Sequence, residues 1–124
     1  MILADISIWI GMFRKGRFKA EMGNLITNDQ LCIHPFVGAE LACGTLPDRQ
    51  KTLAYLDQLA TLPIVRLADV RFMIEARGLW SKGIGLTDVQ LIASCLATPG
   101  TQIWTIDRTL GRVTESLGIR ARLA

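Results

Sequence analysis

Four carboxylates stand among apolar residues, where an unpaired charge would be costly. Asp5 interrupts the apolar stretch 2–10, and Glu40, Asp88 and Asp107 each lie in similarly apolar surroundings. A carboxylate that is buried in such company must be paired, protonated or bound to a metal ion. The positions of these acids therefore predict a site rather than a solvated surface.

Acids that converge on one place can do chemistry with a divalent cation. Four carboxylates at one site repel each other and have raised pKa values until a cation arrives. Carboxylate oxygens with no His or Cys motif nearby favour Mg²⁺, with Mn²⁺ as the alternative, over zinc. Such ions activate water and stabilise the charge that develops on a phosphoryl group.

Each of these acids also has an ordinary structural explanation. Asp88 could favour a helix start through the helix dipole, and Glu40 could pair with a buried arginine. Asp5 or Asp107 could satisfy a local turn. Taken together, at places predicted to share one end of a sheet, the four acids favour a site over these separate roles. Turns or polar helix faces are predicted for other acids: Asp29, Asp48, Asp57 and Glu115.

The elements that must position these acids alternate between short apolar runs and segments with helical spacing. Strands are predicted over residues 1–4, 31–34, 63–67, 101–105 and, at an edge, 119–122. Helices are predicted over residues 7–13, 18–27, 36–44, 48–59, 70–80, 88–97 and 109–117. Thr87 is the predicted N-cap of the helix that Asp88 begins.

This alternation predicts an α/β fold with a mostly parallel sheet that helices cover on both faces. In such folds, ligands bind in the crevice beyond the carboxyl ends of the strands. Asp5 and Asp107 directly follow predicted strands, which places them at that edge.

The acids and their neighbours form four motifs that occur in a fixed order along the chain. The stretches 3–10, 40–44, 85–93 and 105–110 read LADISIWI, ELACG, GLTDVQLIA and TIDRTL. Together they resemble the VapC-type PIN-domain ribonuclease family, where an acid follows the first strand with a hydroxyl two residues later. The resemblance covers almost the whole chain, and the ordered set is much more specific than any single motif.

The resemblance implies a single domain over residues 1–124 with a three-layer α/β/α PIN-like fold. It also implies an endoribonuclease that requires Mg²⁺ or Mn²⁺. The catalytic and metal-binding residues that it implies are the four acids: Asp5, Glu40, Asp88 and Asp107. Ser7 and Thr105 would orient carboxylates or water. The third motif, LTDV at 86–89, is less aromatic than in many relatives, which affects the shape of a subsite rather than the acid itself.

The expected reaction is hydrolysis of RNA phosphodiester bonds. One or two metal ions held by the acids would position the scissile phosphate and a water for in-line attack, which leaves a 5′-phosphate and a 3′-hydroxyl. A type II toxin acting in this way on a transfer RNA or a ribosomal RNA loop would inhibit translation. The resemblance further implies a cognate VapB-like antitoxin as partner and a homodimer.

Two other classes of function compete with this interpretation. A catalytically silent PIN-like module that binds RNA or protein would usually lack one or more acids, whereas all four are present. A phosphatase of the aspartyl type would need an Asp-x-Asp pair after the first strand, and Asp5-Ile6-Ser7 lacks the second Asp. DNA nucleases of this lineage usually carry longer insertions than 124 residues allow.

Contacts to RNA must come from basic residues, because neutralisation of phosphates dominates affinity for nucleic acids. The formal net charge of +3 and the pI near 9.0 are compatible with a polyanionic substrate. Lys82 and Arg108 lie beside site residues in the sequence and are predicted RNA contacts, as are Arg14 and Lys15. For Arg14 and Lys15, a solvated surface or an antitoxin-binding face is an equal alternative.

Composition bounds the remaining possibilities. With 50% hydrophobic and 20% charged residues, the 124-residue chain is expected to fold as one compact domain. No apolar run approaches the roughly 20 residues of a membrane span, and the start lacks a basic signal region. Cys32, Cys43 and Cys95 are expected to be reduced core residues, which together with these features predicts a soluble cytoplasmic protein.

Several prominent side chains have two interpretations each. His34, the only histidine, is expected to have a structural or surface role rather than that of a general base. Trp9 and Trp104 are expected in the core, whereas Trp80 is a candidate contact for RNA or a second protomer. Ordinary packing, or an antitoxin groove or homodimer face, would account for a further group: Leu53, Tyr55, Leu56 and Phe72.

Overall fold

A four-stranded, all-parallel sheet forms the centre of the protein, whose computed structural model describes residues 1–123. Its strands are β1 (Ile2–Ala4), β2 (Leu31–Ile33), β3 (Ala60–Thr61) and β4 (Gln102–Trp104). The strand order is β3-β2-β1-β4, and Ile2 pairs with Leu31 on one side and Gln102 on the other. Ala124, the end of the predicted domain, lies outside the described residues.

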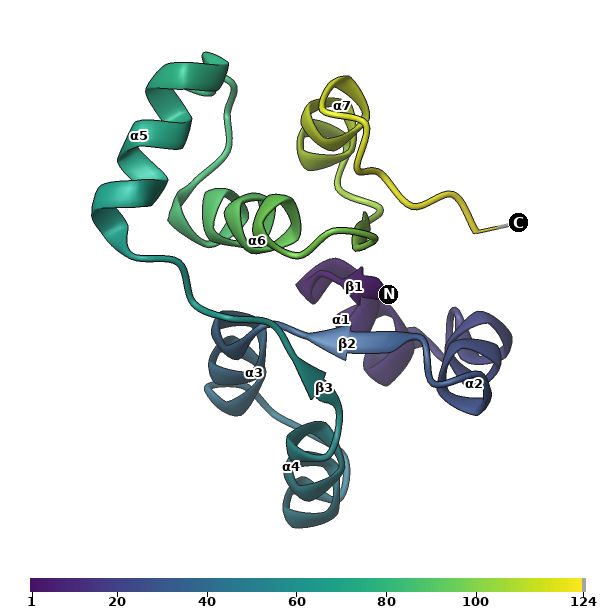
Figure 1. Cartoon of the computed structure of the whole chain (residues 1–124). Helices are drawn as coiled ribbons and strands as arrows, with labels where there is room; N and C mark the ends of the chain where they lie inside the picture. Colours follow the sequence, from purple (N-terminus) through teal and green to yellow (C-terminus); the bar gives the residue numbers. More distant parts are fainter. Residues whose placement is uncertain (124) are drawn as a thin grey trace.

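Helices connect the strands and cover the sheet. In chain order they are α1 (Ile6–Lys15), α2 (Lys19–Thr27), α3 (Pro35–Ala42), α4 (Arg49–Asp57), α5 (Leu67–Arg77), α6 (Leu86–Ala97) and α7 (Arg108–Ser116). The chain moves one way along the sheet from β1 to β3 and then crosses back to β4. Right-handed crossovers in opposite directions put their helices on opposite faces, which produces the predicted three-layer α/β/α architecture. Figure 1 shows α5, α6 and α7 in one half of the view and α1 to α4 in the other.

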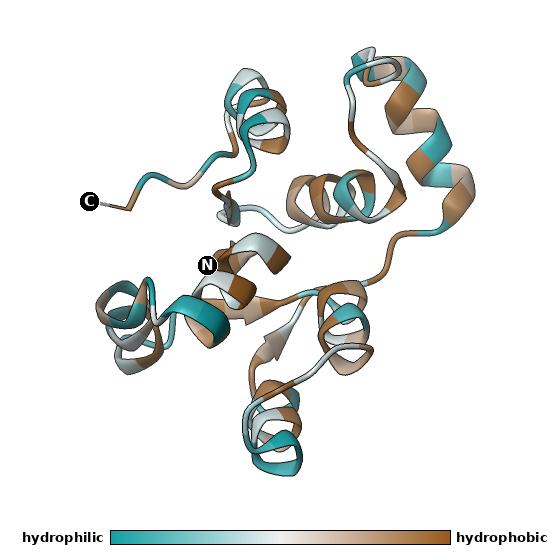
Figure 2. Cartoon of the chain, turned by 180° about the vertical axis from the view of Figure 1, so that it is seen from behind, coloured by the Kyte–Doolittle hydropathy of each residue, from teal (hydrophilic) through white to brown (hydrophobic). Residues whose placement is uncertain are grey.

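The core lies between the sheet and its helices. β2 and much of α6 are hydrophobic (Figure 2), as expected for elements that are buried in a parallel sheet fold. Trp9 and Trp104 are buried, as predicted. Cys32 and Cys95 are also buried, but Cys43 is exposed, so the expectation that all three thiols lie in the core is wrong for Cys43.

The third strand is not where the sequence predicted it. Of the predicted strand 63–67, residues 63–66 are irregular and Leu67 begins α5, whereas β3 consists of Ala60–Thr61. Pro63 has no N–H for a strand ladder. The backbone of Val65 is hydrogen-bonded by a side chain, since Gln90 Oε1 accepts from its N–H at 3.1 Å and Gln90 Nε2 donates to its carbonyl at 2.6 Å. These bonds replace the strand pairing that the apolar pattern suggested.

Two other local predictions need correction. Residues 119–122 form only an isolated parallel bridge between Ile103 and Arg120 rather than an edge strand. Thr87 is not an N-cap, because α6 begins at Leu86 with Gly85 as the residue before it. No helix in the described part of the chain is both long and apolar enough to cross a membrane.

Candidate active site at the carboxyl ends of β1 and β4

β1 and β4 are the neighbouring strands at which the direction of the connections reverses. Such a switch point leaves a crevice beyond the carboxyl ends of the two strands, where ligands bind in open α/β sheets. Asp5 directly follows β1, and Thr105 directly follows β4. The Asp5 N–H donates to the carbonyl of Trp104 at 3.0 Å, which joins the two strand ends.

Asp5 is a buried carboxylate that is held rigidly. Its Oδ1 accepts from Ser7 Oγ at 2.5 Å and from the N–H of Ile8 at 3.3 Å, so that Asp5 caps α1. Its Oδ2 accepts from Thr105 Oγ1 at 2.5 Å. Side-chain partners far apart in the sequence therefore fix both oxygens of a carboxylate that is only 4% exposed.

The hydroxyls of Ser7 and Thr105 extend this network to Asp107. Thr105 Oγ1 accepts from the N–H of Asp107 at 3.0 Å, and Ser7 Oγ accepts from the N–H of Ile106 at 3.2 Å. Asp107 in turn caps α7, where its Oδ1 accepts from the N–H of Leu110 at 2.8 Å. The two acids after β1 and β4 thus serve local turns and also belong to one network of hydrogen bonds.

Glu40 and Asp88 come from two helices, α3 and α6. The Thr87 hydroxyl donates to Glu40 Oε1 at 2.7 Å and links these helices beside the strand ends. Because α6 begins one residue before Thr87, this hydroxyl is free to point across to α3 instead of capping its own helix. This role of Thr87 was not predicted, although its position directly before Asp88 was a signal.

The charges of the other three acids act on Asp88. Burial raises the pKa of Asp88, a hydrogen bond from the Gly85 backbone opposes this, and the charges of Asp107, Asp5 and Glu40 raise the pKa further. Burial also raises the pKa of Asp5, against the hydrogen bonds from Ser7, Thr105 and backbone N–H groups. The fold therefore brings the four acids of the sequence motifs within electrostatic reach of Asp88.

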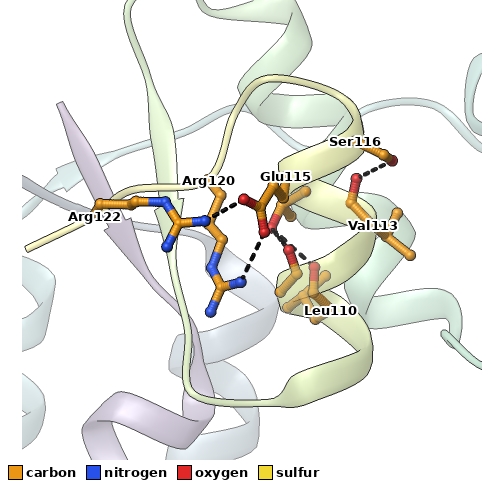
Figure 3. Close-up of polar contacts among 8 residues, drawn as sticks. Leu110, Val113, Glu115, Ser116, Arg120 and Arg122 are labelled. Carbon is orange, nitrogen blue, oxygen red and sulfur yellow. Dashed lines mark hydrogen bonds and ion pairs between the residues drawn. The ribbon is translucent and has the colours of Figure 1, made fainter.

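No cation of the described chain neutralises this group. Among residues 1–123 the ion pairs are Arg66 with Asp69, and Arg120 and Arg122 with Glu115, the latter two drawn in Figure 3. The alternative that Glu40 pairs with a buried arginine is therefore wrong. Over the same residues, no three His, Cys, Asp or Glu side chains are already arranged as ligands of one ion. Mutual repulsion keeps like charges apart unless a cation lies between them.

The donor set fits a hard divalent cation. Among residues 1–123, the side chains that bond to Asp5 and Glu40 there do so through hydroxyl oxygens, and the one histidine bonds elsewhere. Mg²⁺ and Mn²⁺ prefer such oxygen ligands, and a second layer of hydrogen bonds commonly orients the ligating carboxylates. Ser7 and Thr105 on Asp5, and Thr87 on Glu40, are positioned for that second role.

Comparison with known proteins identifies the family. No family model matches the chain. Two relatives named Ribonuclease VapC32 match it, one from Mycobacterium tuberculosis strain CDC 1551 / Oshkosh and one from strain ATCC 25618 / H37Rv. Each is 33% identical over 119 residues, which cover 96% of this chain and 94% of the relative. The chain belongs to the VapC-type PIN-domain ribonuclease family.

Two of the predicted basic residues of this VapC-family chain line two different cavities. Arg14 and Glu40 line a cavity of about 130 Å³ together with apolar side chains of α1 and α3. Lys82 lines a different cavity, of about 370 Å³, beside α7. Lys15 and Arg108 are exposed. Arg77 and Arg112 line the cavity with Lys82, and the predicted RNA contacts did not include them.

His34 is structural in this VapC-family fold, as expected, but it is buried rather than on the surface. Its Nδ1 accepts from the N–H of Phe36 at 2.9 Å and so caps α3, while Nε2 lies 3.0 Å from Ser94 Oγ on α6. Burial lowers the pKa of His34, against a hydrogen bond with Gln90 that raises it. The neutral imidazole therefore ties together the two helices that carry Glu40 and Asp88.

Proposed function

We propose that this protein is a toxin of a type II toxin–antitoxin pair that acts as an endoribonuclease dependent on Mg²⁺ or Mn²⁺. The observation that carries the proposal is the group of four acids at the switch point, where the charges of three act on Asp88 and none of the four has an ion-pair partner in the described chain. Both relatives have names that state a ribonuclease. A catalytically silent binding module would have no need to keep such a group.

The residues that would hold the ion are Asp5, Glu40, Asp88 and Asp107. When bound, Mg²⁺ or Mn²⁺ supplies activation of water and neutralisation of the charge on the scissile phosphate. The protein contributes by fixing its ligands. Ser7 and Thr105 hold both oxygens of Asp5. Thr87 donates to one oxygen of Glu40, and no side chain among residues 1–123 donates to the other. In-line attack by water would leave a 5′-phosphate and a 3′-hydroxyl.

A paired cleavage assay tests the proposal. Wild-type protein and Asp5→Asn are incubated with total cellular RNA in Mg²⁺, Mn²⁺ or EDTA, and the cut ends are mapped by sequencing. We expect discrete cuts with 5′-phosphate ends that need the metal and disappear in Asp5→Asn. Equal cleavage by both proteins, or products ending in a 2′,3′-cyclic phosphate, would contradict it. The same map identifies the target, for which we propose a transfer RNA or a ribosomal RNA loop.

The proposed partners are a VapB-like antitoxin and a second copy of the chain. Exposed apolar side chains on and just before α5 support a protein contact there: Ile64, Leu67 and Phe72 are 55%, 60% and 75% exposed. Hydrophobic bands along α5 are visible in Figure 2. Leu56, predicted as a possible partner contact, is 3% exposed and packs in the core instead. Sedimentation equilibrium of wild type and Phe72→Ser tests the homodimer, which the variant should weaken.

A further inference from the structure

A basic cavity lies next to the acidic site but is separate from it. Its volume is about 370 Å³, and it is bounded by the end of α5, the segment 78–85 and α7. In Figure 1 the segment that joins α5 to α6 runs on the side of α5 that faces α7. Three cationic side chains line the cavity over an apolar floor: Arg77, Lys82 and Arg112 above Leu79, Val113 and Leu117.

The three cations have no anionic partner. No acidic residue lines the cavity, and in the described chain none of the three forms an ion pair or a side-chain hydrogen bond. By contrast, Arg120 and Arg122, which follow α7, are both paired with Glu115 (Figure 3). Like charges around one hollow repel each other, so a bound anion would relieve a cost that this surface otherwise carries.

The wall that carries Lys82 is well anchored. The buried Leu79 donates its N–H to the carbonyl of Ile74 at 3.0 Å. Ser81 has a φ of 58°, which is uncommon for a residue other than glycine. Gly83 packs so closely on α7 that a Cβ there would lie 3.3 Å from Thr109 Cγ2. The close packing of Gly83 on α7 places the adjoining Lys82 beside that helix.

Two elements connect the cavity to the acidic site along the chain. Asp107 caps α7, and Arg112 follows five residues later on the same helix, about 7.5 Å along the axis at 1.5 Å per residue. The segment with Lys82 leads into α6, which carries Asp88 in its first turn. A polymer bound at the acids would thus reach the cations a few units along its length.

We propose that this cavity binds a backbone phosphate of the RNA, a few nucleotides from the scissile bond, and that Trp80 stacks on an adjoining base. The inference rests on the proposed ribonuclease function. Trp80 is 58% exposed, and its ring lies 3.8 Å from where a Cβ on Gly78 would be, at the rim of the cavity. Single-stranded nucleic acids are bound by such combinations of cations and aromatic rings. An acidic peptide would match the cations but would leave Trp80 without a planar partner.

The test measures binding without cleavage. A fluorescein-labelled 2′-O-methyl RNA of about twelve nucleotides, within the usual site size, is titrated with the full chain in EDTA over a range of KCl concentrations. Each lost phosphate contact should reduce the slope of log K against log[salt] by about 0.7. We expect that reduction, with affinity several-fold lower, for Lys82→Gln and for Arg112→Gln. Trp80→Ala should lower affinity by about fivefold or more with an unchanged slope.

Matched variants remove the same charge elsewhere. Lys51→Gln on α4 and Arg71→Gln on α5 should keep the wild-type slope, since neither residue lines the cavity. Thermal unfolding of every variant checks that the fold is intact. If Lys82→Gln and Arg112→Gln keep the slope of their controls, the phosphate site is overturned. The phosphate site is also overturned if Lys82→Gln and Arg112→Gln weaken binding of a poly-glutamate peptide but not of the RNA. That result would make the cavity a protein-docking site.

The proposed ribonuclease function and the phosphate site fail in different ways. Cleavage of RNA by the wild type in Mg²⁺ tests the first, and the salt slope in EDTA tests the second. A wild type that cleaves RNA, with Lys82→Gln and Arg112→Gln slopes unchanged, would overturn only the phosphate site. A wild type that shows the cavity-dependent slope but cleaves nothing would support the site and contradict the nuclease.

Discussion

Glu115 on α7 and the four acids beyond β1 and β4 are all carboxylates, but they differ in what stands beside them. Glu115 is half-exposed and accepts from Arg120 at 3.3 Å and from Arg122 (Figure 3). Asp5, by contrast, is buried and surrounded by hydroxyls, and Asp88 faces three other acids. Glu115 therefore has two cationic partners of its own. Among residues 1–123, none of the four acids at the switch point forms an ion pair.

The largest expected effect separates these two regions by activity. Asp88→Asn should lower RNA cleavage at least about 100-fold, because electrostatic groups at a reacting phosphate are worth a few kcal/mol. Glu115→Gln removes the same kind of charge far from the switch point and should leave cleavage unchanged. Initial rates on one defined RNA in Mg²⁺ measure both. Equal losses in the two variants would show that the distinction between the regions is wrong.

A smaller effect is expected from the hydroxyls that hold the acids. Thr105→Val removes the donor to Asp5 Oδ2 and should weaken binding of Mn²⁺ by about 10- to 100-fold, as is usual for groups that orient metal ligands. Thr101→Val is the matched control, because the Thr101 hydroxyl is buried and has no hydrogen-bond partner among residues 1–123. Calorimetric titration of Mn²⁺ compares them. Unchanged affinity in Thr105→Val would mean that Asp5 needs no orientation.

The pH dependence of stability should also distinguish the acidic group. The pKa values of Asp5 and Asp88 are raised above their ordinary 3.8, so at pH values between 3.8 and the raised pKa the folded state binds more protons than the unfolded state. The free energy of unfolding of the metal-free protein should therefore fall as pH rises through that window. The pKa of His34 is lowered, so between that lowered pKa and its ordinary 6.5 the contribution of His34 to the free energy of unfolding should rise with pH.

The difference between wild type and Asp88→Asn isolates the contribution of the acids from that of His34. Urea unfolding in EDTA, at pH values between 3.8 and the raised pKa, should show that the free energy of unfolding falls less steeply with pH in Asp88→Asn than in the wild type. In the wild type, saturating Mg²⁺ should remove this decrease of the free energy of unfolding with pH, because a bound cation stabilises the ionised carboxylates. A wild type and a variant with parallel pH profiles would argue against mutual repulsion at the switch point.

The smallest effect is expected at the paired carboxylate. Glu115→Gln should lower the free energy of unfolding by no more than about 1 kcal/mol, because ion pairs this exposed are worth little in water. The loss should shrink further at high salt, which screens surface charges. Urea unfolding at low and high NaCl measures it. A loss of several kcal/mol would make this cluster more important to the fold than its exposure indicates.

Sequence patterns predicted most of the fold, and the exceptions have identifiable causes. Helices and strands that depend on local spacing occur close to where they were expected, including α6 and β1. The strand predicted at 63–67 failed because the Gln90 side chain, distant in sequence, takes the hydrogen bonds of Val65. The cap predicted at Thr87 failed because that hydroxyl bonds to Glu40 on another helix.

The sequence by itself determined which acids lie among apolar residues and which of them follow strands. It also determined the alternation of strands and helices that makes the sheet parallel. These are properties of residue type and of spacing over a few positions. Only the tertiary structure decided that Thr105 holds Asp5, that Thr87 holds Glu40, and that Arg77, Lys82 and Arg112 share one cavity. Such contacts depend on the handedness of the crossovers and on how helices pack over the sheet. Periodicity along the chain does not encode that information locally.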